Sequence, residues 1–327
     1  MKRVGNLMPR ILHFDNLRHA FLKASRGKQE KEAVKAFRAH LDERLEEMER
    51  NLAEASFEFN HYHFFTIYDP KKRRICAAHF PTRVVFHALM NVCEPIFERW
   101  QIYDSYACRK GKGTYKALER AKRYAGEYRW FAKLDVRSFF DSIHHDILKK
   151  QLAGLFKDPL LLRIFADIID SHHAFAGRGL PMGNLTSQYF ANHYMAIADH
   201  YAKEQLGVRA MVRYMDDILF FAHEREVLKA WIEKFTCFLS EELNLRIHPV
   251  ILNRTYCGIP YLGYVVYKDR LRLNHRSIKR FKRKVADLEL SWEAGFANEL
   301  KCVDRMQSAL AFVCKADSAG LRAKLFN

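Results

Sequence analysis

The sequence has 327 residues, which is enough for one large domain or for two or three subdomains that share a cleft. Its 55 lysine and arginine residues against 38 aspartate and glutamate residues give a formal net charge of +17, so polyanions, nucleic acids first, are the natural partners. An uninterrupted apolar run of membrane-spanning length and a signal peptide are both absent from the sequence. We therefore expect a cytoplasmic protein without a membrane partner.

The seven cysteines are spread singly through the chain, with no C-x-x-C pair. An odd number of separated cysteines fits neither a disulfide framework nor a zinc cluster. We therefore expect most of them to be small buried side chains.

The predicted elements alternate between helical and extended patterns along the chain, without an internal repeat. Apolar residues at mixed spacings of three and four predict helices over 11–55, and β-branched and aromatic runs around a proline turn predict a hairpin over 60–80. The further predictions, in order, are a helix over 82–100, a strand from 128, a helix from Ser142 or His144, a helix over 158–173, a helix from Thr186 to Gln205 capped by Thr186 or Asn184, strand–turn–strand over 208–222, a helix over 225–243, a hairpin over 259–273 and basic helices over 275–327. This order predicts an α+β fold with its strands gathered around an acidic turn.

The acidic turn lies in "VRYMDDILFF", where Asp216 and Asp217 stand between two apolar runs. Successive side chains of a strand face opposite ways, so a second carboxylate facing the same cleft should come from another strand. Asp135, at the end of the apolar stretch "FAKLDV", is the candidate. Carboxylates from different strands that leave coordination positions open for phosphates suit Mg²⁺. A polar hairpin tip without chemistry is the alternative, because aspartate is common in turns.

The tetrapeptide Tyr-Met-Asp-Asp resembles the Tyr-x-Asp-Asp hairpin of reverse transcriptases, and "KLDVRSFFDSI" resembles the first palm motif of that family. The resemblance implies a right-hand polymerase fold with an antiparallel palm sheet, and an RNA-directed DNA polymerase that copies RNA into cDNA by two-metal nucleotidyl transfer. It implies that Asp135, Asp216 and Asp217 are catalytic and that these three, with the backbone of Val136, hold two Mg²⁺ ions, for which Mn²⁺ could substitute. The implied domains are N-terminal helices and fingers over 1–127 (with part of 150–190), a palm over 128–267 and a basic helical thumb over 268–327.

A second group of residues is implied to bind the incoming nucleotide. "GLPMGNLTSQYFAN" resembles the motif that lies under the templating base, and "YDPKKRRICAAHF" is similar to the fingers. The family pattern makes the Phe140 ring a barrier to a ribose 2′-hydroxyl, although core packing is the alternative for Phe139 and Phe140 and is expected for one of them. "KKRR" alone is typical of a solvated charge run. The nucleotide-binding residues implied are Arg73, Phe140, Met182, Gly183 and Gln188.

Two basic segments and one hairpin are implied to bind template and primer. Residues 109–123 carry seven basic residues against one acidic residue, and residues 276–284 carry six basic residues at helical spacing. "YLGY" resembles a primer-grip hairpin, and a plain basic helix is the alternative for residues 109–123. The implied contacts to the RNA template and the RNA–DNA hybrid are Arg109, Lys110, Lys112, Tyr261, Leu262, Gly263, Lys279, Arg280 and Arg283.

The motifs are most similar to those of bacterial or phage-encoded enzymes, namely those of diversity-generating retroelements and their group II intron relatives. Met182 stands where retroviral enzymes use glutamine, which predicts low fidelity because a thioether cannot make the hydrogen bonds of an amide. The resemblance further implies dNTP substrates and, as additional partners, a small basic accessory protein or a structured non-coding RNA. Val250 and Ile251 replace a lysine that is usual in relatives, so the general acid is left open.

Two other functions remain possible from the sequence. One is an antiphage reverse transcriptase that is protein-primed or independent of a template. The other is a catalytically silent RNA-binding scaffold, which the basic segments would support equally well, although the three aspartates would not.

Overall fold

The computed structural model describes residues 2–68, 72–294 and 299–326 and combines helices with three antiparallel sheets. Residues 1–109, 136–207 and 234–248 form one compact unit, and residues 110–135, 208–233 and 249–327 form a second. Each unit is thus assembled from segments far apart in the chain. The predicted α+β class is confirmed.

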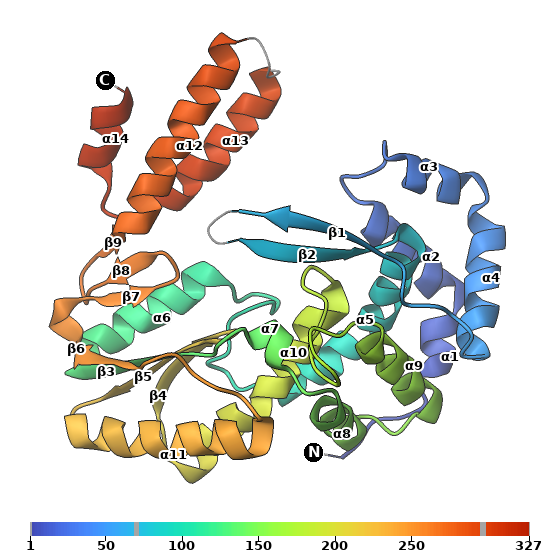
Figure 1. The fold of residues 1–327 in the computed structure, drawn as a ribbon, viewed down its shortest axis with the longest axis horizontal. Helices are drawn as coiled ribbons and strands as arrows, with labels where there is room; N and C mark the ends of the chain where they lie inside the picture. Colours follow the sequence, from blue (N-terminus) through green and yellow to red (C-terminus); the bar gives the residue numbers. More distant parts are fainter. Residues whose placement is uncertain (1, 69–71, 295–298, 327) are drawn as a thin grey trace. The chain divides into compact units, whose positions relative to one another are not determined.

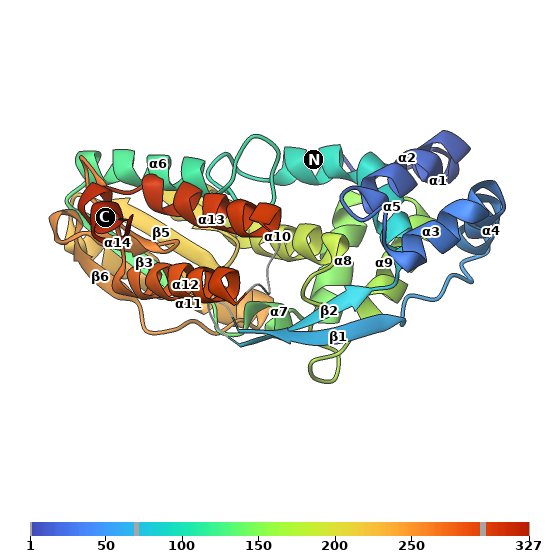
Figure 2. The same ribbon diagram turned by 90° about the horizontal axis from the view of Figure 1, so that it is seen from above.

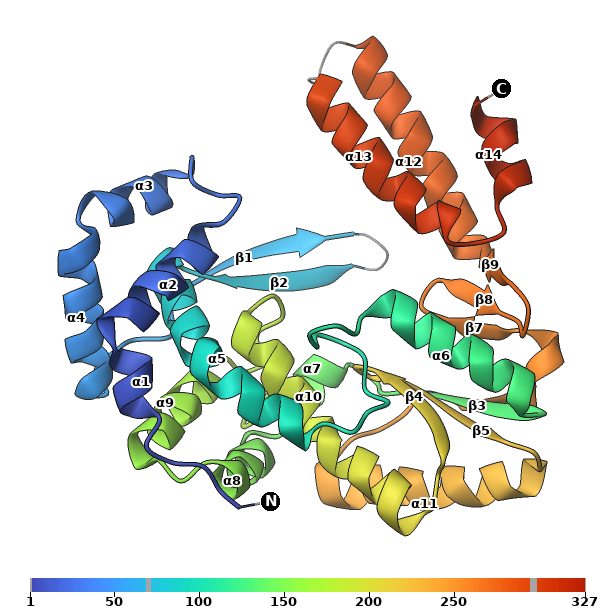
Figure 3. The ribbon, with the colours of Figure 1, turned by 180° about the vertical axis from the view of Figure 1, so that it is seen from behind.

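The first unit begins with four helices, of which the first three pack on a fifth and the fourth packs on those three. α2 illustrates why they form, because its buried side chains Leu17, Ala20, Phe21 and Ala24 recur at spacings of three and four. α2 lies along α5, as Figure 3 shows. The helices are α1 (Met8–Leu12), α2 (Phe14–Ser25), α3 (Glu32–Ala39), α4 (Leu41–Ala53) and α5 (Phe80–Trp100).

The remainder of the first unit is a two-stranded sheet and a group of helices. β1 (Tyr62–Ile67) and β2 (Arg73–Ala78) pair antiparallel, and the proline turn predicted between them lies outside the described residues. The helices are α7 (Phe139–Ser142), α8 (His145–Leu155), α9 (Pro159–Asp170) and α10 (Leu185–His200), which continues as a π-helix over Tyr201–Gln205. Asn184 occupies the N-cap position of α10, as predicted, but its Oδ1 accepts from the Ala78 backbone N–H at 3.2 Å. The cap residue therefore ties the helix to the end of β2.

The second unit is built on a four-stranded sheet in the order β4-β5-β3-β6. Its strands are β3 (Trp130–Asp135), β4 (Ala210–Tyr214), β5 (Asp217–Ala222) and β6 (Ile251–Arg254). α6 (Thr114–Glu127) packs on one face, and the start of α11 (Arg225–Leu243) lies along the other (Figure 1). Coverage of both faces explains why β4 and β5 read as nearly continuous apolar runs.

A three-stranded sheet and three helices complete the second unit. The predicted hairpin is present as β7 (Ile259–Tyr261) and β8 (Tyr264–Val266), and β9 (Leu271–Leu273) adds a third strand. After a short 3₁₀ turn over Thr255–Cys257 and this sheet come α12 (His275–Glu293), α13 (Glu299–Cys314) and α14 (Ala319–Phe326). α12 and α13 pack side by side (Figure 2).

The burial of the cysteines differs from the prediction made from composition. Of the seven, Cys76 and Cys93 are buried, whereas Cys302 is half-buried and the other four are exposed. The prediction that most are buried is wrong because burial depends on which face of an element a residue occupies, and residue type does not set that face. None of the helices in the described parts of the chain is both long and apolar enough to cross a bilayer.

Candidate active site

Strand pairing in the second unit brings the three predicted aspartates together. β3 ends at Asp135 and β5 begins at Asp217, and the antiparallel register places these two residues directly opposite one another. Directly opposed residues on one face have Cβ atoms about 5 Å apart. Asp216 lies in the turn that connects β4 to β5, immediately before Asp217. Three carboxylates from two distant parts of the sequence therefore lie at the same end of the two central strands of the sheet.

The turn that carries the aspartate pair is held by a buried arginine. Met215 has a φ of 58°, a left-handed conformation that is uncommon for residues other than glycine. The Arg213 side chain is completely buried, and its Nη1 donates to the Met215 carbonyl at 3.0 Å. Sequence reasoning missed Arg213, although an arginine inside the apolar strand "AMVRY" was a visible signal.

Asp217 lies in an environment that disfavours its charge. Burial first, and the nearby Asp135 and Asp216 charges to a smaller extent, raise the pKa of Asp217 to about 7 against the lowering effect of Lys133. Lys133 Nζ lies 3.1 Å from Asp217 Oδ2, and only 17% of the Asp217 side chain is exposed. Within the described residues, Asp217 Oδ1 is buried and has no hydrogen-bond partner.

We expect that Asp217→Asn stabilises the metal-free protein. The folded-state pKa is raised above the unfolded value of about 4, so the wild type loses stability relative to the variant as the pH rises from about 4 to about 7. Thermal midpoints in EDTA at about pH 5 and about pH 8 measure this, with the larger advantage of the variant expected at the higher pH. If the difference in thermal midpoint between Asp217→Asn and the wild type is the same at both pH values, the pKa of Asp217 is not raised in the folded protein.

The carboxylates fit a site for divalent cations. They supply hard oxygen donors, and an ion beside them would partner the orphaned Oδ1 and offset the repulsion that raises the Asp217 pKa. In the part of the chain that the structure describes, no three His, Cys, Asp or Glu side chains form a ready-made metal cluster. The three aspartate side chains are thus neighbours, but their oxygens are not arranged around a single metal position.

Two further predicted positions are Val136 and Ile251. Val136 directly follows Asp135, is 2% exposed and forms a bridge with Ile247 within the first unit. Ile251, one of the two residues that replace the usual lysine, lies opposite Lys133 in the β3–β6 register. Lys133 on β3 is therefore the direct cross-strand neighbour of Ile251 on β6.

The two phenylalanines of the first palm motif differ in burial. Phe139 is 3% exposed and Phe140 is half-buried, with their ring centroids 5.7 Å apart. The Phe140 carbonyl accepts from the Leu180 N–H at 2.9 Å, which ties α7 to the following loop. Phe139 is thus a core residue, and Phe140 is the ring that a ligand can reach.

The loop before α10 is fastened to β2. The Met182 carbonyl accepts from the Cys76 N–H at 2.8 Å. Gly183 has a φ of 115°, and a Cβ there would lie 2.9 Å from Ile75 Cγ2. The glycine is therefore required by the strand next to it, in addition to any approach of a ligand. Met182 and Gln188 are half-buried, and Arg73, at the start of β2, is exposed.

Arg109 is engaged within the first unit. Its Nη2 lies 2.7 Å from Glu98 Oε1, and its Nη1 donates to the Ile102 and Ser105 carbonyls. Only 8% of its side chain is exposed. A phosphate contact would require this ion pair to break, and the template role of Arg109 stays a prediction. In the second unit, Lys110 is exposed and Lys112 is half-buried.

The predicted primer-grip hairpin is a tight turn between β7 and β8. Leu262 and Gly263 at its tip both have positive φ, as a two-residue type I′ turn requires. Tyr261 and Tyr264 are buried, and the Gly263 carbonyl accepts from Ser277 Oγ at 2.8 Å. The two tyrosines therefore pack inside the second unit, and Leu262 and Gly263 at the tip are half-buried.

The basic residues predicted on α12 differ in exposure. Lys279 and Arg283 are exposed, and Arg280 is half-buried with its guanidinium 5.3 Å from the centre of the Phe312 ring. Lys279 and Arg283 are thus the cations of this predicted set that solvent reaches most freely.

An antiparallel sheet with one aspartate at the end of β3 and an Asp-Asp pair at the start of the neighbouring β5 is the arrangement that the sequence motifs predict for a polymerase palm. The chain belongs to the family described as reverse transcriptase (RNA-dependent DNA polymerase), whose model matches residues 68–266. This confirms the predicted family and enzyme class. Similarity to enzymes of diversity-generating retroelements in particular stays a prediction.

Similar sequences include intron-encoded proteins and a bacterial protein. The chain is 23% identical over 174 residues to the putative COX1/OXI3 intron 1 protein of Saccharomyces cerevisiae, which covers 50% of this chain and 21% of that protein. It is 27% identical over 134 residues to protein YkfC of Escherichia coli, which covers 38% of this chain and 35% of YkfC. The matched region is therefore a minor part of each relative.

Solved structures share the fold. Apo telomerase from Candida tropicalis matches with a TM-score of 0.53 at 11% identity, over 77% of this chain and 57% of that one. Telomerase from Candida albicans, solved with a fragment of telomeric RNA, matches with a TM-score of 0.51 at 13% identity, over 78% and 53% of the two chains. Identity this low shows a common fold, and the predicted polymerase fold class is confirmed.

Proposed function

We propose that this protein is an RNA-directed DNA polymerase that copies an RNA template into cDNA. The observation that carries the proposal is the register that sets Asp135 opposite Asp217 and next to Asp216. Family membership supports it, because the matched residues 68–266 include all three aspartates. The division into fingers, palm and thumb at the predicted boundaries is part of the same proposal.

The proposed reaction joins the primer 3′ oxygen to the α-phosphorus of a dNTP and breaks the bond to pyrophosphate, while the hydroxyl proton leaves. Asp135 and Asp216 would hold two Mg²⁺ ions, or Mn²⁺, with Asp217 and the Val136 backbone as further ligands. When bound, such ions stabilise charge on the attacking and leaving oxygens. The chain contributes the fixed placement of its carboxylates, so most of the catalysis is positioning and electrostatic stabilisation.

The remaining predicted residues are proposed to hold substrates. Arg73, exposed at the start of β2, would meet the triphosphate, and Phe140, Met182, Gly183 and Gln188 would contact the nucleotide. Phosphates of template and primer would meet exposed cations, which favours Lys110, Lys279 and Arg283 over the ion-paired Arg109. Lys112, Arg280 and the hairpin Tyr261–Gly263 complete the proposed set, the hairpin through its backbone.

Incorporation of dTTP on poly(rA) primed with oligo(dT) tests the function directly. We expect incorporation that requires Mg²⁺ and is lost in EDTA. Tight RNA binding without incorporation would overturn the proposal in favour of an RNA-binding scaffold.

The biological role that we propose is that of the low-fidelity enzyme of a diversity-generating retroelement. Met182 supports this, because its thioether offers no amide hydrogen bonds to the nucleotide. Template and variable repeats beside the gene would support the role, and their absence would favour an antiphage enzyme. A structured non-coding RNA or a small basic accessory protein would then be a partner.

We expect that Met182→Gln lowers the misincorporation frequency. The added amide can donate to and accept from the nucleotide, which a thioether cannot do. Sequencing of cDNA copied from a defined RNA by both proteins measures the substitution spectrum. If the two spectra coincide, Met182 does not set fidelity.

We expect that Arg213→Met lowers the extension rate by about 100-fold, because misplacement of the turn displaces the aspartates that it carries. Single-turnover extension rates with saturating dNTP measure this, and Arg209→Met, an exposed arginine just before β4, is the matched control. Arg213→Lys keeps the charge but loses the planar fork, so we expect partial recovery. A wild-type rate for Arg213→Met would show that the buried contact does not position the turn.

A further inference from the structure

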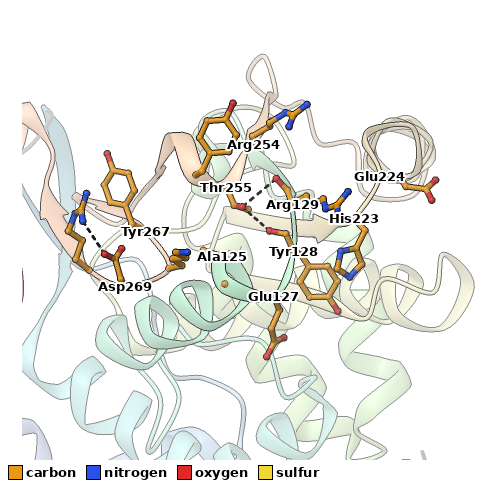
Figure 4. A pocket seen from close by; sticks show the side chains of 14 residues that line it. Ala125, Glu127, Tyr128, Arg129, His223, Glu224, Arg254, Thr255, Tyr267 and Asp269 are labelled. Carbon is orange, nitrogen blue, oxygen red and sulfur yellow. Dashed lines mark hydrogen bonds and ion pairs between the residues drawn. The ribbon is translucent and has the colours of Figure 1, made fainter.

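A cavity of about 960 Å³ lies in the second unit, at the end of the four-stranded sheet remote from the aspartates (Figure 4). Its lining residues 125–129 directly precede β3, and His223 directly follows β5. The aspartates stand at the opposite ends of these two strands. Six residue steps separate Arg129 from Asp135 and His223 from Asp217, so at a rise of about 3.3 Å per residue the cavity begins roughly 20 Å from the aspartates.

Aromatic rings form part of the cavity wall. Tyr128, Tyr256 and Tyr267 line it, and Tyr256 is 73% exposed. Thr255 Oγ1 donates to the Tyr128 carbonyl at 2.8 Å, which fixes the segment next to Tyr256 against the start of β3. Bases can stack on rings that are presented and held in this way.

Aromatic and cationic groups of the lining also lie close to one another and to Trp130. The Arg254 guanidinium lies 4.9 Å from the centre of the Trp130 ring and 5.9 Å from that of Tyr256. Tyr128 and His223 have ring centroids 4.8 Å apart, and Figure 4 shows them side by side. Arginine planes and aromatic faces together are the usual platform for unpaired bases.

The charge that remains unpaired in this cavity is positive. Asp269 is paired with Arg270 at 3.0 Å, and Glu127 with Arg123 at 2.7 Å. Arg129, Arg254 and Lys268 are exposed and, among the described residues, have no carboxylate within ion-pair distance. Among the lining residues, these three cations outnumber the one acid not accounted for above, Glu224. The lining therefore attracts phosphates.

We propose that this cavity binds an unpaired segment of RNA away from the site of polymerisation. The rings take the bases and the exposed cations take the phosphates between them. A duplex hides its base faces, so this wall selects a single strand. That the strand is RNA rests on the proposed function. This contact would anchor the RNA molecule while another part of it is copied.

Photocrosslinking tests the proposal on the full-length protein. The probe is a short single-stranded RNA that carries one 4-thiouridine, and the crosslinked peptides are identified by mass spectrometry. We expect crosslinks at Tyr128 or Tyr256. Combining Tyr256→Ala with Arg129→Ala should weaken binding of the probe, measured by fluorescence anisotropy, by about tenfold or more, which is the loss of one stacked base. The matched control combines Tyr103→Ala with Arg18→Ala, an exposed tyrosine and an exposed arginine of the first unit.

Crosslinks that map only outside the cavity, or an unchanged affinity of the cavity variant, would overturn the proposal. Equal competition by a fully paired RNA hairpin would also overturn it, because stacking requires free base faces. Asp216→Asn should crosslink as the wild type does, and the cavity variant should extend a pre-annealed short primer at the wild-type rate. Loss of polymerase activity alone would therefore refute the proposed function and leave this binding site standing.

Discussion

Replacing Asp216 with asparagine is expected to reduce primer extension by about 1000-fold or more, equivalent to about 4 kcal/mol of transition-state stabilisation. The amide keeps the size of the side chain but removes the charge that would hold a divalent cation. RNA affinity and the thermal midpoint should stay near those of the wild type, because the half-buried turn position of Asp216 is filled by a side chain of the same size. Extension of poly(rA)/oligo(dT) with dTTP measures the loss.

Asp146→Asn is the matched control for this experiment. Asp146 is exposed on α8, and its substitution removes the same charge far from Asp216 in the sequence. Extension by Asp216→Asn at a rate close to that of the control would rule out the metal assignment. A lower RNA affinity in Asp216→Asn would instead indicate that the carboxylate supports the fold of the turn.

Replacing Phe140 with alanine is expected to admit ribonucleotides, lowering the preference for dNTP over rNTP by about 100-fold. The half-buried ring is the accessible member of the Phe139 and Phe140 pair, and its removal leaves room for a 2′-hydroxyl. The ratio of kcat/KM for dTTP to that for UTP on one primer–template measures the preference.

Phe175→Ala serves as the control, because this phenylalanine is 68% exposed in the same unit and its loss leaves no cavity. Phe139→Ala is unsuitable, since removal of a buried ring costs about 3–5 kcal/mol of stability. If Phe140→Ala discriminates as well as the wild type, the ring does not set sugar selectivity.

Local patterns in the sequence were sufficient for most elements. The 3–4 spacing of apolar residues located α2 and α5, and the apolar runs on either side of Asp216 located β4 and β5. These predictions succeed because helix and strand periodicities are set by residues close together in the chain. Strand patterns pointed to the candidate aspartates, the family motifs added their catalytic role, and the boundaries of fingers, palm and thumb stay a prediction.

Local sequence patterns did not predict the partners of individual polar side chains. Arg109 was predicted to meet a template, but Glu98, eleven residues earlier, neutralises it in the folded chain. Arg213 drew no attention, yet it is completely buried and holds the Met215 carbonyl. Whether a charge meets solvent, a ligand or a carboxylate depends on what the fold places opposite it.

The sequence by itself determined the order of helices and strands, the net positive charge and the acidic residues available for chemistry. Tertiary structure alone decided that Asp135 lies across from Asp217, that Lys133 reaches the same carboxylate, and that tyrosines and unpaired cations gather at the far end of the sheet. The physical reason is that strand register is set by hydrogen bonds and packing between segments distant in the chain, and no local pattern encodes those partners.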